Sequence, residues 1–436
     1  MTALNASALA IFGGPKTINE KFSLYNPLGV EEVEAGKAVI ESGVLSQYLG
    51  AWHPDFFGGP KVKEFEARCA EYFGVKHVIT VNSWTSGLVA AVGAIGIGPG
   101  DEVITTPWTM SATATAILHW NGIPVFADID KDTFNLDLAS VERNITEQTK
   151  AIISVDIFGM SSDMDEIMTL GQKYNLKVVS DTAQGPGAKY KEKYAGTLAD
   201  IGGFSLNYHK HIHTGEGGIL VTNDDVLAER MQLIRNHAEV VVEGKGVENL
   251  TNMVGHNFRL GEIECAIGIE QLYKLPRLVK ERQALAMALT AELSALPYIQ
   301  TPVIKEDRDH VFYVYPLILD VANLGVSREK ICDALEAEGL SVMRRYQNIH
   351  LLPMYQQKIA FGASGFPWNS EFCKRDIDYG KGICPVAEEL NDHSFIGIGM
   401  CVYDLGKDDI SLIGQAFKKV WANIESLKID YKPREK

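Results

Sequence analysis

Short apolar runs alternate with helical patterns through the first two thirds of this sequence. Strand-like runs cover residues 78–81, 102–106, 124–127, 151–155, 177–184 and 200–206, and helical patterns cover 30–43, 62–73 and 88–95. Parallel strands need long crossover connections, which are usually helices. The alternation therefore predicts an α/β fold with a mostly parallel sheet.

Chain length and net charge limit the classes of protein to which this sequence can belong. The chain has 436 residues, of which 46% are hydrophobic, enough for a large core and more than one ordinary domain. Its net charge of −15 argues against a nucleic-acid partner, which would need a basic surface. We find no apolar run that could span a membrane, no signal-peptide pattern and no Cys-x-x-Cys pair. We expect a cytoplasmic protein that binds neither nucleic acid nor membrane.

The pattern divides the chain into three parts. Residues 1–26 read as an N-terminal arm, and residues 27–275 contain the alternating strands and helices. Residues 276–436 begin with a long charged helical pattern at 278–296 and continue with a second βα pattern. We therefore expect a large domain over 27–275 and a smaller C-terminal domain over 276–436.

A lysine stands among three histidines in residues 204–218, FSLNYHKHIHTGEGG. Lys210 follows a strand end and precedes a glycine-rich turn, a place suited to an imine with an aldehyde cofactor. Such a lysine must lose its proton readily, and a partly desolvated pocket lowers its pKa. The alternative is a surface lysine in a loop, which is the usual interpretation of a lone lysine.

The histidines of this stretch alternate along the chain. His209, His211 and His213 would lie on one side of an extended backbone. Such a run could bind a metal ion. No carboxylate or cysteine accompanies them, so we expect no metal and predict hydrogen-bonding or substrate-facing roles instead.

Two more segments place polar residues directly after strands. Asp181 ends the strand in KVVSDTAQ, where ligands bind in open α/β sheets, with Gln184 three residues on. Residues 82–87, NSWTSG, join a strand to a helix and could offer backbone N–H groups to a phosphate. The alternative for each segment is an ordinary helix N-cap, and Trp108, which also follows a strand, would by itself be read as a core residue.

These segments together resemble the DegT/DnrJ/StrS family of pyridoxal-phosphate (PLP) sugar aminotransferases, from about residue 25 to about residue 272. FSLNYHKHIHTGEGG is similar to the family's FSFHPxKxITTGEGG, and DTAQ to its DAAQ or DAAH. VGHNFRLGEIECAIGIEQL, residues 254–272, is similar to GYNYRMSELQAALGLAQL. The resemblance implies the PLP-dependent aspartate-aminotransferase-like (type I) fold. It has a large domain with a mixed, mostly parallel sheet and a smaller C-terminal α/β domain.

The resemblance also implies a role for each matching residue. Lys210 would bind PLP covalently and then move protons, while Asp181 would hold the ring nitrogen protonated and Gln184 would reach the ring 3-hydroxyl. The remaining cofactor contacts would be Trp108 stacked on the ring, Trp84, Thr85 and Ser205 at the phosphate, and Asn257 at the phosphate of a neighbouring subunit. The protein would then be a homodimer with shared active sites.

The implied reaction is transamination from an amino acid, by family habit L-glutamate, to a keto-sugar. The histidines near Lys210 suggest a free acidic keto-sugar, such as 8-oxo-3-deoxy-octulosonate for lipopolysaccharide, contacted by His209, His211, His213 and Arg344. A nucleotide-linked keto-sugar is the alternative acceptor. A PLP-dependent sugar dehydratase, a non-catalytic regulatory PLP-binding protein and a metal-binding protein are the alternative functions.

Overall fold

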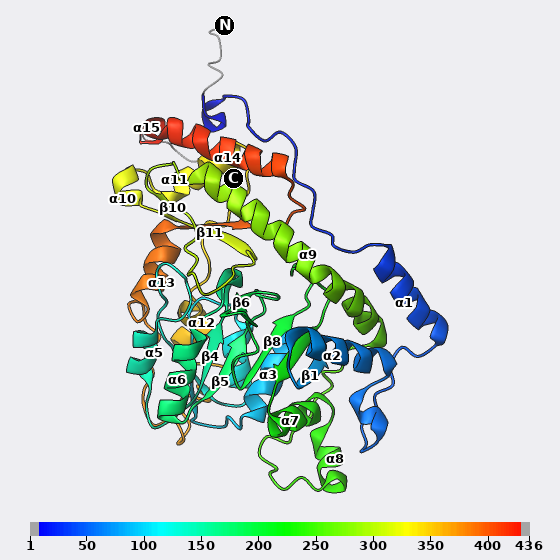
Figure 1. The fold of residues 1–436 in the computed structure, drawn as a ribbon. Helices are drawn as coiled ribbons and strands as arrows, with labels where there is room; N and C mark the ends of the chain where they lie inside the picture. The colour runs from blue at the N-terminus through cyan, green and yellow to red at the C-terminus, as the bar shows by residue number, and fades with distance from the viewer. Residues whose placement is uncertain (1–7, 429–436) are drawn as a thin grey trace.

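A seven-stranded sheet forms the centre of the larger part of the molecule (Figure 1). The computed structural model describes residues 8–428. The strand order is β1-β9-β8-β5-β4-β2-β3, and β9 runs antiparallel to both of its neighbours while the remaining pairs are parallel. The predicted mixed, mostly parallel sheet is confirmed. Its strands are β1 (His77–Val81), β2 (Glu102–Thr105), β3 (Ile123–Phe126), β4 (Thr149–Val155), β5 (Lys177–Asp181), β8 (Ile201–Ser205) and β9 (Gly218–Thr222).

Successive side chains along a strand point to opposite faces of the sheet. Both faces of this sheet are apolar, and helices cover both of them. Ile152 and Val178 lie in one hydrophobic cluster, whereas their neighbours Ile153 and Val179 lie in the other. A sheet buried on both faces gives continuous apolar runs, which is the pattern that the sequence carries. The helices around the sheet are α2 (Pro60–Phe73), α3 (Trp84–Ala94), α4 (Ala112–His119), α5 (Leu138–Asn144), α6 (Met164–Tyr174), α7 (Asp225–Arg235) and α8 (Ala238–Lys245).

One long helix, α9 (Glu262–Leu293), joins the two parts of the molecule (Figure 1). The sequence predicted a long charged helix at 278–296, but α9 begins at Glu262 and continues through Pro276. A proline inside a helix removes one backbone hydrogen bond, and packing of α9 against α1 (Val30–Ser42), α2 and α14 (Lys407–Ala422) compensates for it. The boundary predicted at residue 275 therefore lies inside a continuous helix.

The smaller part is built on the antiparallel strands β10 (Ile299–Gln300), β11 (Val314–Leu319) and β12 (Phe395–Gly399). Leu9 and Ile18 of the predicted arm pack into its core, and Met343 contributes an isolated bridge to Gly397. The segment around Ile349 instead packs into the core of the large sheet. The remaining strands and α-helices of the whole described chain are β6 (Lys189–Tyr190), β7 (Lys193–Tyr194), α10 (Val321–Leu324), α11 (Arg328–Ala337), α12 (Pro353–Gln357), α13 (Pro385–Glu389) and α15 (Ile424–Leu427).

The predicted arm and the predicted C-terminal domain each extend beyond the described residues. Residues 1–7 of the predicted arm and residues 429–436 of the predicted C-terminal domain are outside the described residues. Between residues 8 and 428, the helices lack the combination of length and apolarity that membrane crossing requires.

Candidate active site

A cavity of about 270 Å³ lies at the carboxyl ends of β5 and β8. This is where ligands bind in open α/β sheets. Segments from both parts of the molecule form its wall. The lining residues are Ser83, Trp84, Thr85, Thr109, Met110, Ala112, Val155, Asp181, Ala183, Gln184, Ser205, Asn207, His209, Lys210, Glu216, Gly217, Tyr313 and Tyr346.

Lys210 is buried at this cavity, with only 7% of its surface exposed. It lies in the turn after β8, where its backbone N–H donates to the Asn207 carbonyl at 3.0 Å. Its Nζ lies 4.3 Å from the centre of the Tyr313 ring. Burial lowers the pKa of Lys210 from 10.5 to about 8, although the Asp181 carboxylate acts in the opposite direction. The surface-lysine alternative is wrong.

Asp181 ends β5 and points its carboxylate into the same cavity. Its Oδ1 accepts from Trp84 Nε1 at 2.6 Å and from Ala183 N at 3.2 Å. Its Oδ2 accepts from Thr113 Oγ1 at 2.8 Å. Burial raises the pKa of Asp181, whereas the hydrogen bonds from Thr113 and Trp84 and the charge of Lys210 lower it.

Gln184 is fixed in place by bonds at both ends of its amide. Its Oε1 accepts from Phe158 N at 2.8 Å, and its Nε2 donates to the Tyr346 hydroxyl at 3.1 Å. Tyr346 and Tyr313 come from the C-terminal part of the chain, and sequence reasoning missed both. Burial raises the pKa of Tyr346 to about 12, so its hydroxyl stays protonated.

The first turn of α3 lies at the cavity, and the N–H groups of a helix start, which lack partners within the helix, are suited to bind an anion. Ser83 is the N-cap, since its Oγ accepts from Ser86 N at 3.1 Å. The N-cap alternative is therefore correct for Ser83, and Thr85 nevertheless lines the cavity. Ser205 reaches the cavity from the end of β8.

Trp108 is not a cavity residue, and its predicted stacking on a cofactor ring is wrong for this structure. Its side chain is 0% exposed, its Nε1 donates to Asn348 Oδ1 at 2.7 Å, and its ring stacks on Phe134 at 5.8 Å. The alternative reading as a core residue is correct. Met110, two residues on, lines the cavity with 67% of its surface exposed.

The three histidines do not face one side, because the chain turns after β8 instead of remaining extended. His209 lines the cavity, and burial with the nearby Lys210 charge lowers its pKa to about 4. His211 is buried away from it and donates from Nε2 to the Val311 carbonyl at 2.8 Å. His213 Nδ1 accepts from Gly215 N at 3.3 Å. Of the three histidines, His209 is the one that lines the cavity and is placed to face a substrate.

Arg344 and Asn257 also lie outside the cavity lining. Arg344 pairs with Asp333 at 2.6 Å and Glu336 at 2.7 Å on α11, so its predicted substrate contact is wrong for this structure. Asn257 is exposed, and its Oδ1 accepts from Arg259 Nε at 2.7 Å. Its contact with a neighbouring subunit stays a prediction.

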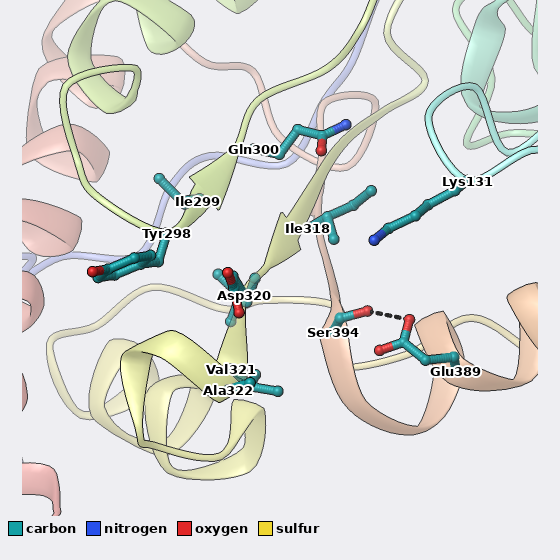
Figure 2. Close-up of a pocket in the computed structure, with 11 residues that line it drawn as sticks. Lys131, Tyr298, Ile299, Gln300, Ile318, Asp320, Val321, Ala322, Glu389 and Ser394 are labelled. Carbon is teal, nitrogen blue, oxygen red and sulfur yellow. Dashed lines mark hydrogen bonds between the residues drawn. The ribbon is translucent and has the colours of Figure 1, made fainter.

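A larger depression, of about 480 Å³, lies beside β10 and β11. Figure 2 shows Lys131 reaching toward it and Ser394 donating to Glu389, a bond of 2.9 Å. Within the described part of the chain, its lining includes none of the predicted site residues. We therefore assign the active site to the smaller cavity.

The donor set of the smaller cavity fits PLP. Lys210 supplies a buried amine for the aldehyde, Asp181 a buried carboxylate for the ring nitrogen, and α3 with Thr85 and Ser205 an anion site for the phosphate. Fold and site together define a PLP-dependent enzyme of fold type I.

Comparison with known proteins agrees with this assignment. The chain belongs to the DegT/DnrJ/EryC1/StrS aminotransferase family, which it matches over residues 51–383. It is therefore a PLP-dependent aminotransferase.

Individual relatives cover most of the chain. It is 34% identical to the spore coat polysaccharide biosynthesis protein SpsC of Bacillus subtilis, over 87% of this chain and 95% of that protein. It is 36% identical to a GDP-perosamine synthase of Caulobacter vibrioides, over 68% and 79% of the two chains. The structure of Helicobacter pylori PseC, an aminotransferase of pseudoaminic acid biosynthesis, covers 93% of this chain and 100% of its own, with a TM-score of 0.75 and 29% identity.

Proposed function

We propose that the protein transfers an amino group from L-glutamate to the carbonyl carbon of a keto-sugar. The observation that carries the proposal is the buried Lys210 amine, which shares one cavity with the Asp181 carboxylate. The names of the relatives, which include a GDP-perosamine synthase and an aminotransferase of pseudoaminic acid biosynthesis, support a sugar as acceptor.

Lys210 is suited to move the proton. When bound, PLP supplies an aldehyde for the amino group and a ring that accepts electrons from the donor's α-carbon. Lys210 Nζ removes the proton from that α-carbon as a general base, and it can do so because a pKa of about 8 leaves part of the amine neutral near pH 7. When PLP is bound, Asp181 would hold the ring nitrogen, and Gln184, which is held by its bond to Tyr346, would contact the edge of the ring.

The charge of the cavity lining distinguishes a free acidic keto-sugar from a nucleotide-linked keto-sugar as the acceptor. A free acidic keto-sugar such as 8-oxo-3-deoxy-octulosonate, a precursor of lipopolysaccharide, would need a cation for its carboxylate. Apart from Lys210, which would bind the cofactor, the cavity lining has no Lys or Arg among the described residues. His209 is neutral at pH 7 because its pKa is about 4, and Glu216 is acidic. This balance favours a nucleotide-linked keto-sugar, whose charged part can extend beyond the cavity.

We further propose a cytoplasmic homodimer in which Asn257 reaches the neighbouring site. Val30, Val33 and Ile40 leave an exposed apolar stripe on α1, which a second subunit could cover. All six cysteines are free, as expected in a reducing compartment. The sedimentation of the purified protein tests the dimer, and a monomer with full activity would contradict shared sites.

The test of the reaction follows the colour of the bound cofactor. Single amino acids are added to the PLP-loaded protein, and L-glutamate is expected to bleach the cofactor band. After removal of glutamate, nucleotide-linked and free keto-sugars are added separately, and recovery of the band identifies the acceptor. Lys210→Ala is the control, because it keeps the cavity and removes the base. A protein that no amino acid bleaches is not an aminotransferase of this kind, and recovery by free sugar acids alone would reverse the choice between acceptors.

A further inference from the structure

Trp84 does not direct its side chain at the phosphate end of the cavity. Its backbone begins α3, but its indole extends across to β5, where Nε1 donates to Asp181 Oδ1 at 2.6 Å. An indole has a single hydrogen-bond donor, so this contact uses all the polar capacity of the side chain. The indole therefore holds the Asp181 carboxylate, which would bind the ring nitrogen of PLP.

Glycines on neighbouring elements leave the space that the indole fills. Gly203 pairs with Asp181 in the β5–β8 register, and a Cβ at Gly203 would lie 2.3 Å from Trp84 Cζ3. A Cβ at Gly87 would lie 2.8 Å from Trp84 Cε3. The indole lies across Gly203 to reach the residue beside it, and only 5% of Trp84 remains exposed. This close fit fixes the direction of the N–H.

The second carboxylate oxygen is held in the same way. Asp181 Oδ2 accepts from Thr113 Oγ1 at 2.8 Å, and Thr113 in turn contacts Thr109 Oγ1 at 2.8 Å. With one oxygen held by Trp84 and the other by Thr113, the carboxylate cannot rotate freely. An ionised carboxylate can accept about four hydrogen bonds, so capacity remains for a ring N–H.

We propose that Trp84 is a positioning residue that fixes the Asp181 carboxylate for the pyridinium nitrogen of PLP. The indole N–H also stabilises the ionised carboxylate in a buried setting, where charge is otherwise disfavoured. Because Trp84 is the first residue of α3, it links the phosphate-binding helix start to the carboxylate at the other end of the cofactor. The inference rests on the cofactor and not on the identity of the sugar.

The test is Trp84→Phe, which keeps an aromatic ring and removes the N–H. The ring-nitrogen NMR chemical shift of bound PLP is expected to move toward the unprotonated value. Bleaching by L-glutamate should slow about ten- to hundredfold, the effect of one hydrogen bond to a charged group. Binding of pyridoxal, which has no phosphate, should weaken by the same factor as binding of PLP.

Trp120→Phe is the matched control. Trp120 lies in the same hydrophobic cluster as Trp84, and its Nε1 donates to the Val89 carbonyl at 2.8 Å. This variant loses an equivalent indole bond away from Asp181, so the ring-nitrogen shift and the bleaching rate should remain those of the native protein.

Two results would overturn the proposal. A folded Trp84→Phe protein with the native ring-nitrogen shift would do so, and so would weaker binding of PLP with unchanged binding of pyridoxal, since that assigns Trp84 to the phosphate. If Trp84→Phe does not fold, benzothienylalanine at position 84 replaces the N–H by sulfur with nearly the same shape, and the same measurements apply. The NMR readout needs no amino donor, so it also decides the matter if L-glutamate proves not to be the donor.

Discussion

Replacing Lys210 by methionine should stabilise the PLP-free protein at neutral pH. Burial lowers the pKa of Lys210 from 10.5 to about 8, so the folded state holds its proton less tightly than the unfolded state does. Each pKa unit corresponds to about 1.36 kcal/mol, which makes the buried ammonium unfavourable by ~3 kcal/mol at pH 7. Methionine has nearly the same length and carries no charge, so Lys210→Met should raise the free energy of unfolding by up to that amount.

The sign of the pH dependence gives the sharper test. Above about pH 10.5 the amine is neutral in both states and the ionisation penalty is absent, and the penalty grows as the pH falls through that range to about 8. Urea unfolding of the PLP-free native and Lys210→Met proteins should therefore give a difference that is constant below pH 8 and shrinks toward pH 10.5.

An independent measurement uses the reactivity of the amine. At pH 7 about a tenth of Lys210 should be neutral, against roughly 0.03% of an ordinary lysine, so its acetylation by a mild reagent should have a midpoint near pH 8. A midpoint near 10.5 together with a pH-independent stability difference would refute the account of Lys210 as a desolvated base.

Three further substitutions test the surroundings of the site. Thr113→Val removes a hydrogen-bond donor that lowers the pKa of Asp181, so the acid limb of the pH–rate profile should move to higher pH. Bleaching by L-glutamate should slow about tenfold. An acid limb at the native pH would contradict the role of this bond. Arg344→Ala should leave kcat and KM unchanged and cost about 1 kcal/mol of stability, because its partners are carboxylates on α11; a large rise in KM would restore its predicted substrate contact. Gly203→Ala should destabilise the fold by ~3 kcal/mol or more in thermal unfolding, because its Cβ would lie 2.1 Å from a backbone oxygen of β9. Gly98→Ala is its control, since the nearest atom would lie 3.9 Å away, and equal losses for both variants would argue against the packing of β8 described above.

Most of the residues expected to contact the cofactor lie together as predicted, because each lies at or just after the end of a strand. Asp181, Gln184, Ser205 and Lys210 all line one cavity, and local order alone brings them to the carboxyl edge of the sheet. Thr85 follows β1 in the same way, at the start of α3. The parallel arrangement was predictable for a related reason, since a sheet buried on both faces requires apolar runs in its strands.

The sequence predicted less well the residues whose role depends on which way the side chain points. Trp108 and Met110 are two positions apart after β2, and only the packed structure decides that the indole enters the core while Met110 faces the cavity. The same holds for Trp84, whose backbone position was consistent with a phosphate contact but whose indole reaches Asp181. His211 and His213 turn away because the segment after β8 is a turn, which alternating spacing cannot reveal.

The sequence by itself determined the sheet class, the positions of the amine and the carboxylate, and the family of the enzyme, because each depends on short-range order that a local pattern records. Tertiary structure alone decided that Tyr313 and Tyr346, more than a hundred residues beyond Lys210, close the cavity. It also decided the two side-chain donors that hold Asp181, because contacts between distant segments depend on how helices and strands pack and leave no periodic trace in either segment.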